Sequence, residues 1–407
     1  MNRDPLTHAA SAYLHTLCND IFSRALGSSG NRAATDWFAD TVAAFGFAVE
    51  KPSFACMDWS SSGASLAASN IVYPAHSSPY SLGCDVRAPL VVVNTVAELE
   101  SADITDKIVL LYGDIAREQL MPQNFAFYNP VEHQHIYQLL NSKRPAAIIT
   151  ATGRNPSVAG ALYPFPMLED GDFDVPSVYL TDKQGTSIAG HVGETVHLVS
   201  CAERRLAGAS NVIARRAGMG SGRIVLMAHI DTKAGTPGAL DNAGGIVTLL
   251  LLAELLSDYT GRHTIEIVAL NGEDYYSNPG EMEYMRRNRG AFDTIALAVN
   301  VDGVGYHKGK TAWSLYGCPP ALTQALDAGL SVYSGLCEGE PWYQGDHMMM
   351  VMHERPTLAF TSEQAMELLT TVIHTERDTP ALVDPARLIE IAFALREVVW
   401  RVNMLER

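Results

Sequence analysis

Residues 225–245 read VLMAHIDTKAGTPGALDNAGG, and this stretch decides which kind of fold the chain takes. It starts in an apolar run that predicts a buried strand over 223–228, and it ends in glycines that lead into a long apolar, helix-like run. Three titratable side chains, His229, Asp231 and Asp241, follow the strand. Charged residues are rarely buried without a partner, so we expect a functional site at this turn.

The alternation of strand and helix continues to the end of the chain. Apolar strands are predicted at 264–270, 294–300 and 356–361, with helices between them, and a long amphipathic helix is predicted at 385–405. Alternation of this kind produces a mostly parallel sheet, and ligands collect beyond the carboxyl ends of its strands. The predicted fold class is therefore α/β, with a mostly parallel central sheet flanked by helices.

The first half of the chain has a different pattern of predicted secondary structure. Helices are predicted at 6–26 and 31–45, followed by a strand, and from about residue 76 short strands alternate with polar and proline-rich loops. A chain of 407 residues is too long for one typical core. We therefore predict a catalytic domain formed by 1–75 and 206–407, with a small β-rich domain inserted at 76–205.

Composition limits the possible partners and compartment. The chain has 29 basic and 45 acidic residues and a net charge of −16, which argues against nucleic acid as a partner. Its longest apolar stretch, 246–253, is far shorter than the ~20 residues of a membrane span, and the N-terminus has no run of signal-peptide type. The six cysteines form no CxxC pair, so we predict a cytoplasmic protein with no membrane partner.

Polar side chains follow each predicted strand of the second half of the chain. They are His229, Asp231, Asp241, Glu273, Asp274, Asp302 and His374. A single carboxylate in such a place is more often a helix cap, and Asp241 before Asn242 is a plausible one. Four groups that point to the same rim are harder to explain in that way. Imidazoles together with carboxylates are the ligands of a zinc site.

Six motifs resemble, in order and spacing, those of the co-catalytic dizinc exopeptidases, the family of bacterial leucyl aminopeptidases and aminopeptidase Y. They are HID, ALDNAGG, NGED, NVDGVG, GDH and IHTERDT. Each motif is weak alone, but the set is specific, and it covers about 1–75 and 206–407. The block 76–205 resembles the protease-associated domain that is often inserted in these exopeptidases.

The resemblance implies two zinc ions, or other divalent metals, held by five side chains. His229 and Asp302 are implied as ligands of one ion, and Asp274 and His374 as ligands of the other. Asp241 resembles the carboxylate that bridges the two. Three aspartates and a bridging hydroxide would balance the four positive charges of two such ions.

Two further residues acquire implied roles. Glu273 resembles the general base, which takes a proton from the water between the metals and passes it to the leaving amine. Asp231 resembles the acid that orients His229, a role that the alternation of side chains along a strand also permits.

The sequence departs from the family at two positions. The acidic pair after Gly272 is usually Glu-Glu and is Glu-Asp here, so Asp274 must bind through one oxygen or its loop must come closer. Some relatives carry a tyrosine that stabilises the oxyanion directly before the last histidine ligand, where this chain has Ile373. We predict that Tyr343, in WYQGDH, serves in its place.

These features predict an enzyme that hydrolyses peptide bonds in small peptides or amino acid amides, most readily an aminopeptidase. A carboxypeptidase, an N-acyl amino acid deacylase and a glutaminyl cyclase remain alternatives on the same scaffold. A non-enzymatic binding protein, like the transferrin receptor among the relatives, is disfavoured because every ligand position is filled. Within the motifs only Arg377 offers a cation for a substrate carboxylate, although Arg286, Arg287 and Arg289 of the following helix could supply one.

Overall fold

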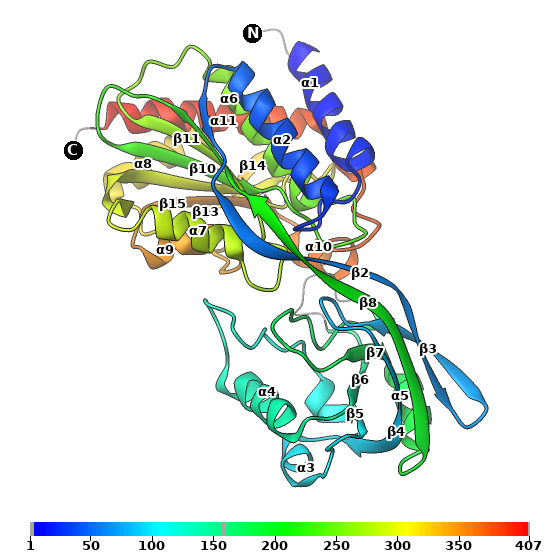
Figure 1. Ribbon diagram of the computed structural model, residues 1–407. Coiled ribbons are helices and arrows are strands. Elements are labelled where there is room, and N and C mark those ends of the chain that lie inside the picture. The colour runs from blue at the N-terminus through cyan, green and yellow to red at the C-terminus, as the bar shows by residue number, and fades with distance from the viewer. Residues whose placement is uncertain (1–3, 156–159, 161, 406–407) are drawn as a thin grey trace. The chain divides into compact units, whose positions relative to one another are not determined.

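The computed structural model describes residues 4–155, 160 and 162–405, and the chain divides into two compact units (Figure 1). Unit 1 comprises Met1–Cys56, Ala207–Leu368 and Val372–Arg407, and unit 2 comprises Met57–Leu206 and Leu369–Thr371. The chain enters unit 2 within strand β2 (Ser53–Ala68) and returns within strand β8 (Thr195–Ser210). Each unit has its own sheet.

Unit 2 begins at Met57, earlier than the boundary at residue 76 that the sequence predicts. The reason lies in β2, a strand of 16 residues whose middle reads SSSG. Serine and glycine are typical of turns, so the sequence pattern places the change of domain beyond this strand. The likeness of unit 2 to a protease-associated domain stays a prediction.

The sheet of unit 1 has eight strands in the order β1-β9-β11-β10-β12-β15-β13-β14. They are β1 (Ala48–Glu50), β9 (Val212–Arg216), β10 (Arg223–His229), β11 (Thr264–Leu270), β12 (Ile295–Val301), β13 (Thr311–Tyr316), β14 (Leu336–Glu338) and β15 (Thr357–Ser362). The central strands β11, β10, β12 and β15 are parallel to one another, and β9 and β13 flank them in the antiparallel direction. The predicted α/β class with a mostly parallel central sheet is confirmed.

Helices cover both faces of this sheet (Figure 1). They are α1 (Asp4–His15), α2 (Ser29–Ala44), α6 (Gly244–Leu255), α7 (Pro279–Arg287), α8 (Pro320–Leu330), α9 (Met348–Met352), α10 (Ala365–Thr371) and α11 (Pro385–Met404). α6 packs against α11, α1 and β10, while α7 and α9 contribute buried side chains to the core on the opposite face. This double cover explains why β10 is continuously apolar over residues 224–228, because both of its faces are buried there.

The first helix is shorter than the predicted 6–26. α1 ends at His15 and continues as a short π-helix, η1 (Thr16–Asp20), after which an irregular segment follows. Leu17 and Cys18 of η1 are buried, and the chain loses its helical conformation only after Asp20. The consequence is that Arg24, at the end of this segment, is buried in the core of unit 1.

Unit 2 is built on a closed sheet in the order β2-β3-β7-β6-β5-β4-β8. Its remaining elements are β3 (Ile71–Ser77), β4 (Cys84–Val93), α3 (Val96–Ser101), β5 (Ile108–Tyr112), η2 (Gly113–Ala116), α4 (Val131–Lys143), β6 (Ala147–Thr152), β7 (Ser177–Thr181) and α5 (Asp182–Ala189). One apolar core fills the inside of this sheet, and a second lies under α3 and α4.

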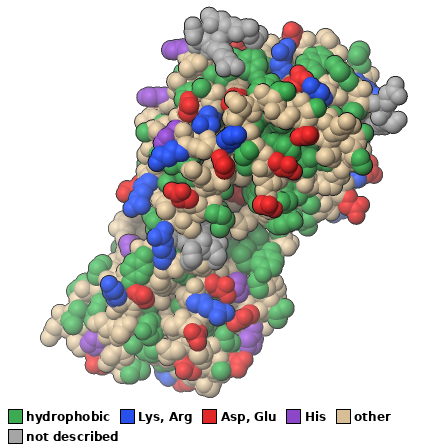
Figure 2. Space-filling view, turned by 180° about the vertical axis from the view of Figure 1, so that it is seen from behind, with side chains coloured by type: hydrophobic (Ala, Val, Ile, Leu, Met, Phe, Trp, Pro, Cys, Tyr) green, Lys and Arg blue, Asp and Glu red, His purple; other side chains and the backbone are tan. Residues whose placement is uncertain are grey.

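Two features of the structure bear on the predicted partners. No helix among the described residues is long and apolar enough to cross a membrane. On the face drawn in Figure 2, lysine and arginine side chains lie among aspartates and glutamates and do not gather into a basic patch.

Candidate metal centre

Three neighbouring parallel strands bring most of the predicted site residues to one edge of the sheet. β10 ends at His229, β11 leads directly into Glu273 and Asp274, and β12 leads into Asp302. Because β11, β10 and β12 are adjacent and run in the same direction, their carboxyl ends meet. The sequence prediction that these side chains share a rim is correct in its geometry.

Asp241 and His374 complete the cluster from two loops. Asp241 lies in the turn η3 (Ala239–Ala243) before α6, and His374 follows α10 with a left-handed φ of 62°. A residue with a side chain adopts this conformation at a cost, and such residues concentrate at functional sites. Asp241 places Oδ1 3.0 Å from His229 Nε2 and Oδ2 3.0 Å from His374 Nε2. One carboxylate thus lies between the two imidazoles.

The other carboxylates flank this central group. Asp274 Oδ1 lies 2.7 Å from His374 Nε2, and Asp302 Oδ1 lies 3.5 Å from His229 Nε2. The arrangement has an imidazole and an outer carboxylate on each side of Asp241. This is the division into two ligand sets that the resemblance implies, although the metal-binding roles themselves stay predictions.

The cluster suits divalent cations. Atoms of His229, Asp241 and Asp274 that are able to bind a metal lie within 4.8 Å of one another, and all three residues are buried. His229 Nε2 is near Asp241, but among the described residues it has no hydrogen bond of suitable geometry. Burying so many carboxylates together is unfavourable unless positive charge accompanies them. The residues present therefore fit the metals that the resemblance implies.

The pKa shifts reflect the same crowding. Burial lowers the pKa of His229 and of His374, but neighbouring carboxylates outweigh burial and raise both well above the ordinary value. Burial raises the pKa of Asp241, and the two imidazoles more than reverse this effect, so that its pKa is lowered. Burial also raises the pKa of Asp302 and of Glu273. Metal ligands must be deprotonated, so we expect ions to displace the imidazole protons on binding.

Asp231 makes its main contacts with the NGED loop. Its buried carboxylate accepts hydrogen bonds from the backbone amides of Gly272 (2.7 Å) and Asp274 (3.1 Å). His229 Nδ1 is closer to the main-chain oxygen of Asp231 (3.2 Å) than to its carboxylate (3.8 Å). Asp231 therefore fixes the loop that carries Asp274 and orients His229 through its backbone.

Two supporting residues lie outside the set predicted from the sequence. Asp378 accepts hydrogen bonds from the amides of Leu240 (2.8 Å) and Asp241 (3.0 Å), and burial raises its pKa to about 7. Arg24, on the far side of this turn, donates to four carbonyl oxygens. They belong to Leu17 (2.7 Å), Ile230 (2.9 Å), Pro237 (2.9 Å) and Gly238 (2.9 Å). Together these residues hold both ends of the loop that presents Asp241.

Asp378 has a sequence signal, because it belongs to the IHTERDT motif. Arg24 has none, because a lone arginine in a segment of helical spacing predicts a solvated side chain. Its importance becomes visible only when the segment after α1 is seen to turn inward.

We expect replacement of Arg24 with methionine to lower the free energy of unfolding by about 3–5 kcal/mol, because it leaves buried carbonyls and Asp378 without their cation. Urea denaturation of the two proteins measures the difference. Arg32→Met is the matched control: Arg32 is exposed and bonds to the Gly27 carbonyl, so its loss should cost under about 1 kcal/mol. Equal stability of the two variants would contradict this role.

A second group of buried acids lies beside Glu273. The pKa of Glu281 is raised by burial and, to a smaller extent, by the charge of Glu273. The pKa of Asp346 is raised by burial and by the charge of Glu281. Asp346 belongs to the GDH motif, which the resemblance singles out without assigning a role. His347 beside it is buried, its pKa is lowered to about 4, and its Nε2 lies 3.0 Å from the Trp342 carbonyl oxygen. The imidazole of His347 is therefore neutral.

Tyr343 lies in the loop that follows β14. Its side chain is 69% exposed, and its ring centroid is 6.1 Å from that of Tyr316. The same loop approaches the site at Gly345, where an added Cβ would lie 3.4 Å from Asp302 Oδ2. Ile373 is buried. The oxyanion role of Tyr343 stays a prediction.

The comparison with protein families agrees with this geometry. Residues 211–399 match the model of peptidase family M28. This part of the chain is therefore similar to the M28 peptidases. The match includes His229, Asp241, Glu273, Asp302 and His374, and it lies within unit 1 apart from Leu369–Thr371. No curated protein sequence matches the chain.

Solved structures show that the similarity of fold extends beyond residues 211–399. An aminopeptidase from Aneurinibacillus sp. strain AM-1 has a TM-score of 0.77 at 20% identity, over 98% of this chain and 96% of that one. BSAP, a zinc aminopeptidase from Bacillus subtilis, has a TM-score of 0.73 at 14% identity, over 97% and 94%. A peptidase M28 precursor from Shewanella amazonensis has a TM-score of 0.70 at 17% identity, over 99% and 96%. At identities as low as these, the structural similarity establishes the fold alone.

Proposed function

We propose that this chain is a metallo-aminopeptidase that uses two divalent ions, zinc in the first instance, to release N-terminal residues from small peptides and amino acid amides. The observation that carries the proposal is the position of Asp241 between His229 and His374, with one further carboxylate on each side. Two of the structurally similar proteins are described as aminopeptidases, and one of these as a zinc enzyme. Both descriptions support the choice within family M28.

The contacts support the ligand sets that the resemblance implies. His229 and Asp302 would hold one ion, His374 and Asp274 the other, and Asp241 both. The bound ions would supply Lewis acidity, which lowers the pKa of water to about 7 and polarises the carbonyl of the scissile bond. The short side chain of Asp274 suffices here, because Asp231 fixes its loop and one of its oxygens already lies 2.7 Å from His374 Nε2.

Glu273 is suited to proton transfer. Its Oε2 is 4.0 Å from His229 Nε2, so it lies beside the ligand cluster, and its side chain is 20% exposed, so substrate and water have access to it. Burial raises its pKa, followed by the charges of Asp274 and Asp302. A carboxylate with a raised pKa takes a proton from the attacking water and returns it to the leaving amine more effectively.

Acceptors for a free α-amine surround the centre. Glu273 and Asp302 are partly exposed and lie on the same edge of the sheet, where they could accept hydrogen bonds from an ammonium group. A carboxypeptidase would need a cation there. Arg286 is bonded to Glu283 on helix α7, and both line a pocket that contains none of the predicted ligands. Arg286 is therefore committed to that pocket and does not supply the cation.

Matched substrates with and without a free amine test the proposal. Leucine p-nitroanilide should be hydrolysed, and its N-acetyl analogue should have a kcat/KM lower by on the order of 10² or more. Acetylation removes hydrogen bonds of a charged group that are each worth about 1.5–3 kcal/mol. Equal or faster cleavage of the acetylated member would replace the aminopeptidase with a deacylase or carboxypeptidase. The cytoplasmic location predicted from the cysteine spacing belongs to the same proposal.

A further inference from the structure

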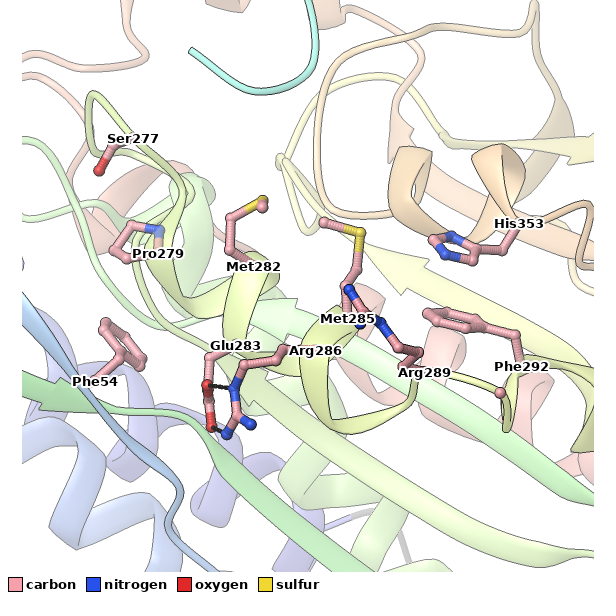
Figure 3. Close-up of a pocket in the computed structure, with 11 residues that line it drawn as sticks. Phe54, Ser277, Pro279, Met282, Glu283, Met285, Arg286, Arg289, Phe292 and His353 are labelled. Atoms are coloured by element: carbon pink, nitrogen blue, oxygen red, sulfur yellow. Dashed lines mark hydrogen bonds and ion pairs between the residues drawn. The ribbon is translucent and has the colours of Figure 1, made fainter. Parts of the chain in front are cut away.

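A pocket of about 700 Å³ lies along helix α7 of unit 1 (Figure 3). Its walls come from segments that are distant in sequence, because Phe54 belongs to β2, Met282 and Met285 to α7, and Phe292 to the short helix η4 (Phe292–Thr294). None of the described residues that line it is a predicted metal ligand. A volume of this size is typical of a site for a small molecule.

The walls of the pocket are mainly apolar. Two methionines, two phenylalanines and Pro279 line it, and Met282 is 41% exposed. Methionine side chains are flexible and polarisable, so they adapt to apolar ligands of different shapes. An apolar surface of this kind, left open to water, indicates that something apolar binds there.

The charges at the pocket leave one cation without a partner. Glu283 and Arg286 are joined by two hydrogen bonds of 2.7 and 2.8 Å and neutralise each other, as the dashed lines in Figure 3 show. Arg289 also lines the pocket, and within the described part of the chain it has no ion pair. The pocket therefore carries a net positive charge in a chain whose net charge is −16.

A second polar group lies at the same end as Phe292. The imidazole of His353 stacks on the Phe292 ring with centroids 3.7 Å apart, and its Nδ1 lies 2.8 Å from the Met349 carbonyl oxygen. Nδ1 therefore donates to that carbonyl, and Nε2 is left to face other groups. Figure 3 shows Arg289 and His353 at the same end of the pocket.

The helix that forms the floor is held firmly in place. On its buried face Tyr284 donates a hydrogen bond to Glu266 Oε1 (2.6 Å), and directly after its last turn Asn288 accepts one from Arg223 (2.9 Å). Because these hydrogen bonds already fix α7, the helix loses little conformational entropy when a ligand binds, which makes the free energy of binding more favourable. The pocket is therefore preformed along α7.

We propose that this pocket binds a small apolar monocarboxylate, whose alkyl or aryl body packs against Met282, Met285 and Phe292 and whose carboxylate pairs with Arg289. The guanidinium group matches a carboxylate in a two-bond geometry, and it repels an amine of the same length. A medium-chain fatty acid and the carboxyl end of an apolar peptide both have this chemistry, an apolar body with one carboxylate. The inference is independent of the proposed hydrolytic function, because no ligand or base of the metal centre takes part.

Isothermal titration calorimetry of the full chain with octanoate tests the site. We expect one binding event with a Kd on the order of 1 mM or tighter, in keeping with the size of the ligand. Arg289→Glu and Met282→Asp should each weaken it by about tenfold or more. Both positions are exposed, so the variants should keep the melting temperature of the parent protein.

Three comparisons complete the experiment. Arg262→Glu reverses an exposed cation outside the pocket and should change the octanoate Kd by less than about twofold. Octylamine should not bind in the pocket, so any octylamine binding should be the same in the wild-type chain, Arg289→Glu and Met282→Asp. N-acetylphenylalanine, which resembles the carboxyl end of a peptide, is titrated in parallel with octanoate. Tighter binding of octanoate indicates a site for an acyl chain, and tighter binding of N-acetylphenylalanine indicates a site for a peptide carboxyl end. The absence of octanoate binding, or binding that neither Arg289→Glu nor Met282→Asp changes, would overturn the proposal.

Discussion

Replacing Glu273 with glutamine is expected to lower kcat by on the order of 10²–10⁴, the usual contribution of a general base, while the fold and the metal content stay intact. Glutamine has the same shape but does not take up the proton of the attacking water. Turnover of leucine p-nitroanilide, measured together with metal content by elemental analysis, gives the result. Near-normal turnover in a variant with its full metal content would remove Glu273 from the mechanism.

Glu281→Gln provides the matched control for this experiment. Glu281 is also a buried glutamate, and Glu273 contributes to raising its pKa well above the ordinary value. This shift favours the neutral carboxylic acid, and the neutral amide of glutamine replaces that form with little change in charge. We expect kcat to change by less than about threefold. A loss equal to that of Glu273→Gln would show that the loss of turnover is not specific to Glu273.

The second large effect concerns Asp241. The wild-type chain should bind two divalent ions about 3.5–4 Å apart, and Asp241→Asn should lower the metal content and reduce kcat/KM by on the order of 10³ or more. A bound metal contributes several kcal/mol of transition-state stabilisation, and about 1.4 kcal/mol corresponds to a factor of ten. Asp241 has this influence because its two oxygens each lie 3.0 Å from a different imidazole.

Elemental analysis and anomalous scattering measure the number and separation of the ions. Asp327→Asn, on the exposed side of α8, is the control and should keep both ions and full activity. A single ion at full occupancy, with Asp274 or His374 turned away from it, is incompatible with the dinuclear centre.

Most of the ligand cluster was accessible from the sequence, for a simple reason. In a parallel sheet, residues that follow successive apolar strands must meet at one edge, so His229, Asp274 and Asp302 are placed by strand order alone. The position of His374 was less accessible, because it depends on a loop with a left-handed residue. The contacts of Asp231 differ from the predicted ones: its carboxylate accepts hydrogen bonds from Gly272 and Asp274, and His229 lies closer to its backbone.

The sequence by itself determined the α/β class and the set of residues that could bind metal, because the hydrophobic period and the residues that follow each strand are local features of the chain. Tertiary structure alone decided which carboxylate lies between the imidazoles and which groups support it. Arg24 shows the difference most clearly, since its four carbonyl partners come from three separate stretches of chain. A buried cation is stable only where such partners converge, and their convergence depends on packing between segments that no local pattern records.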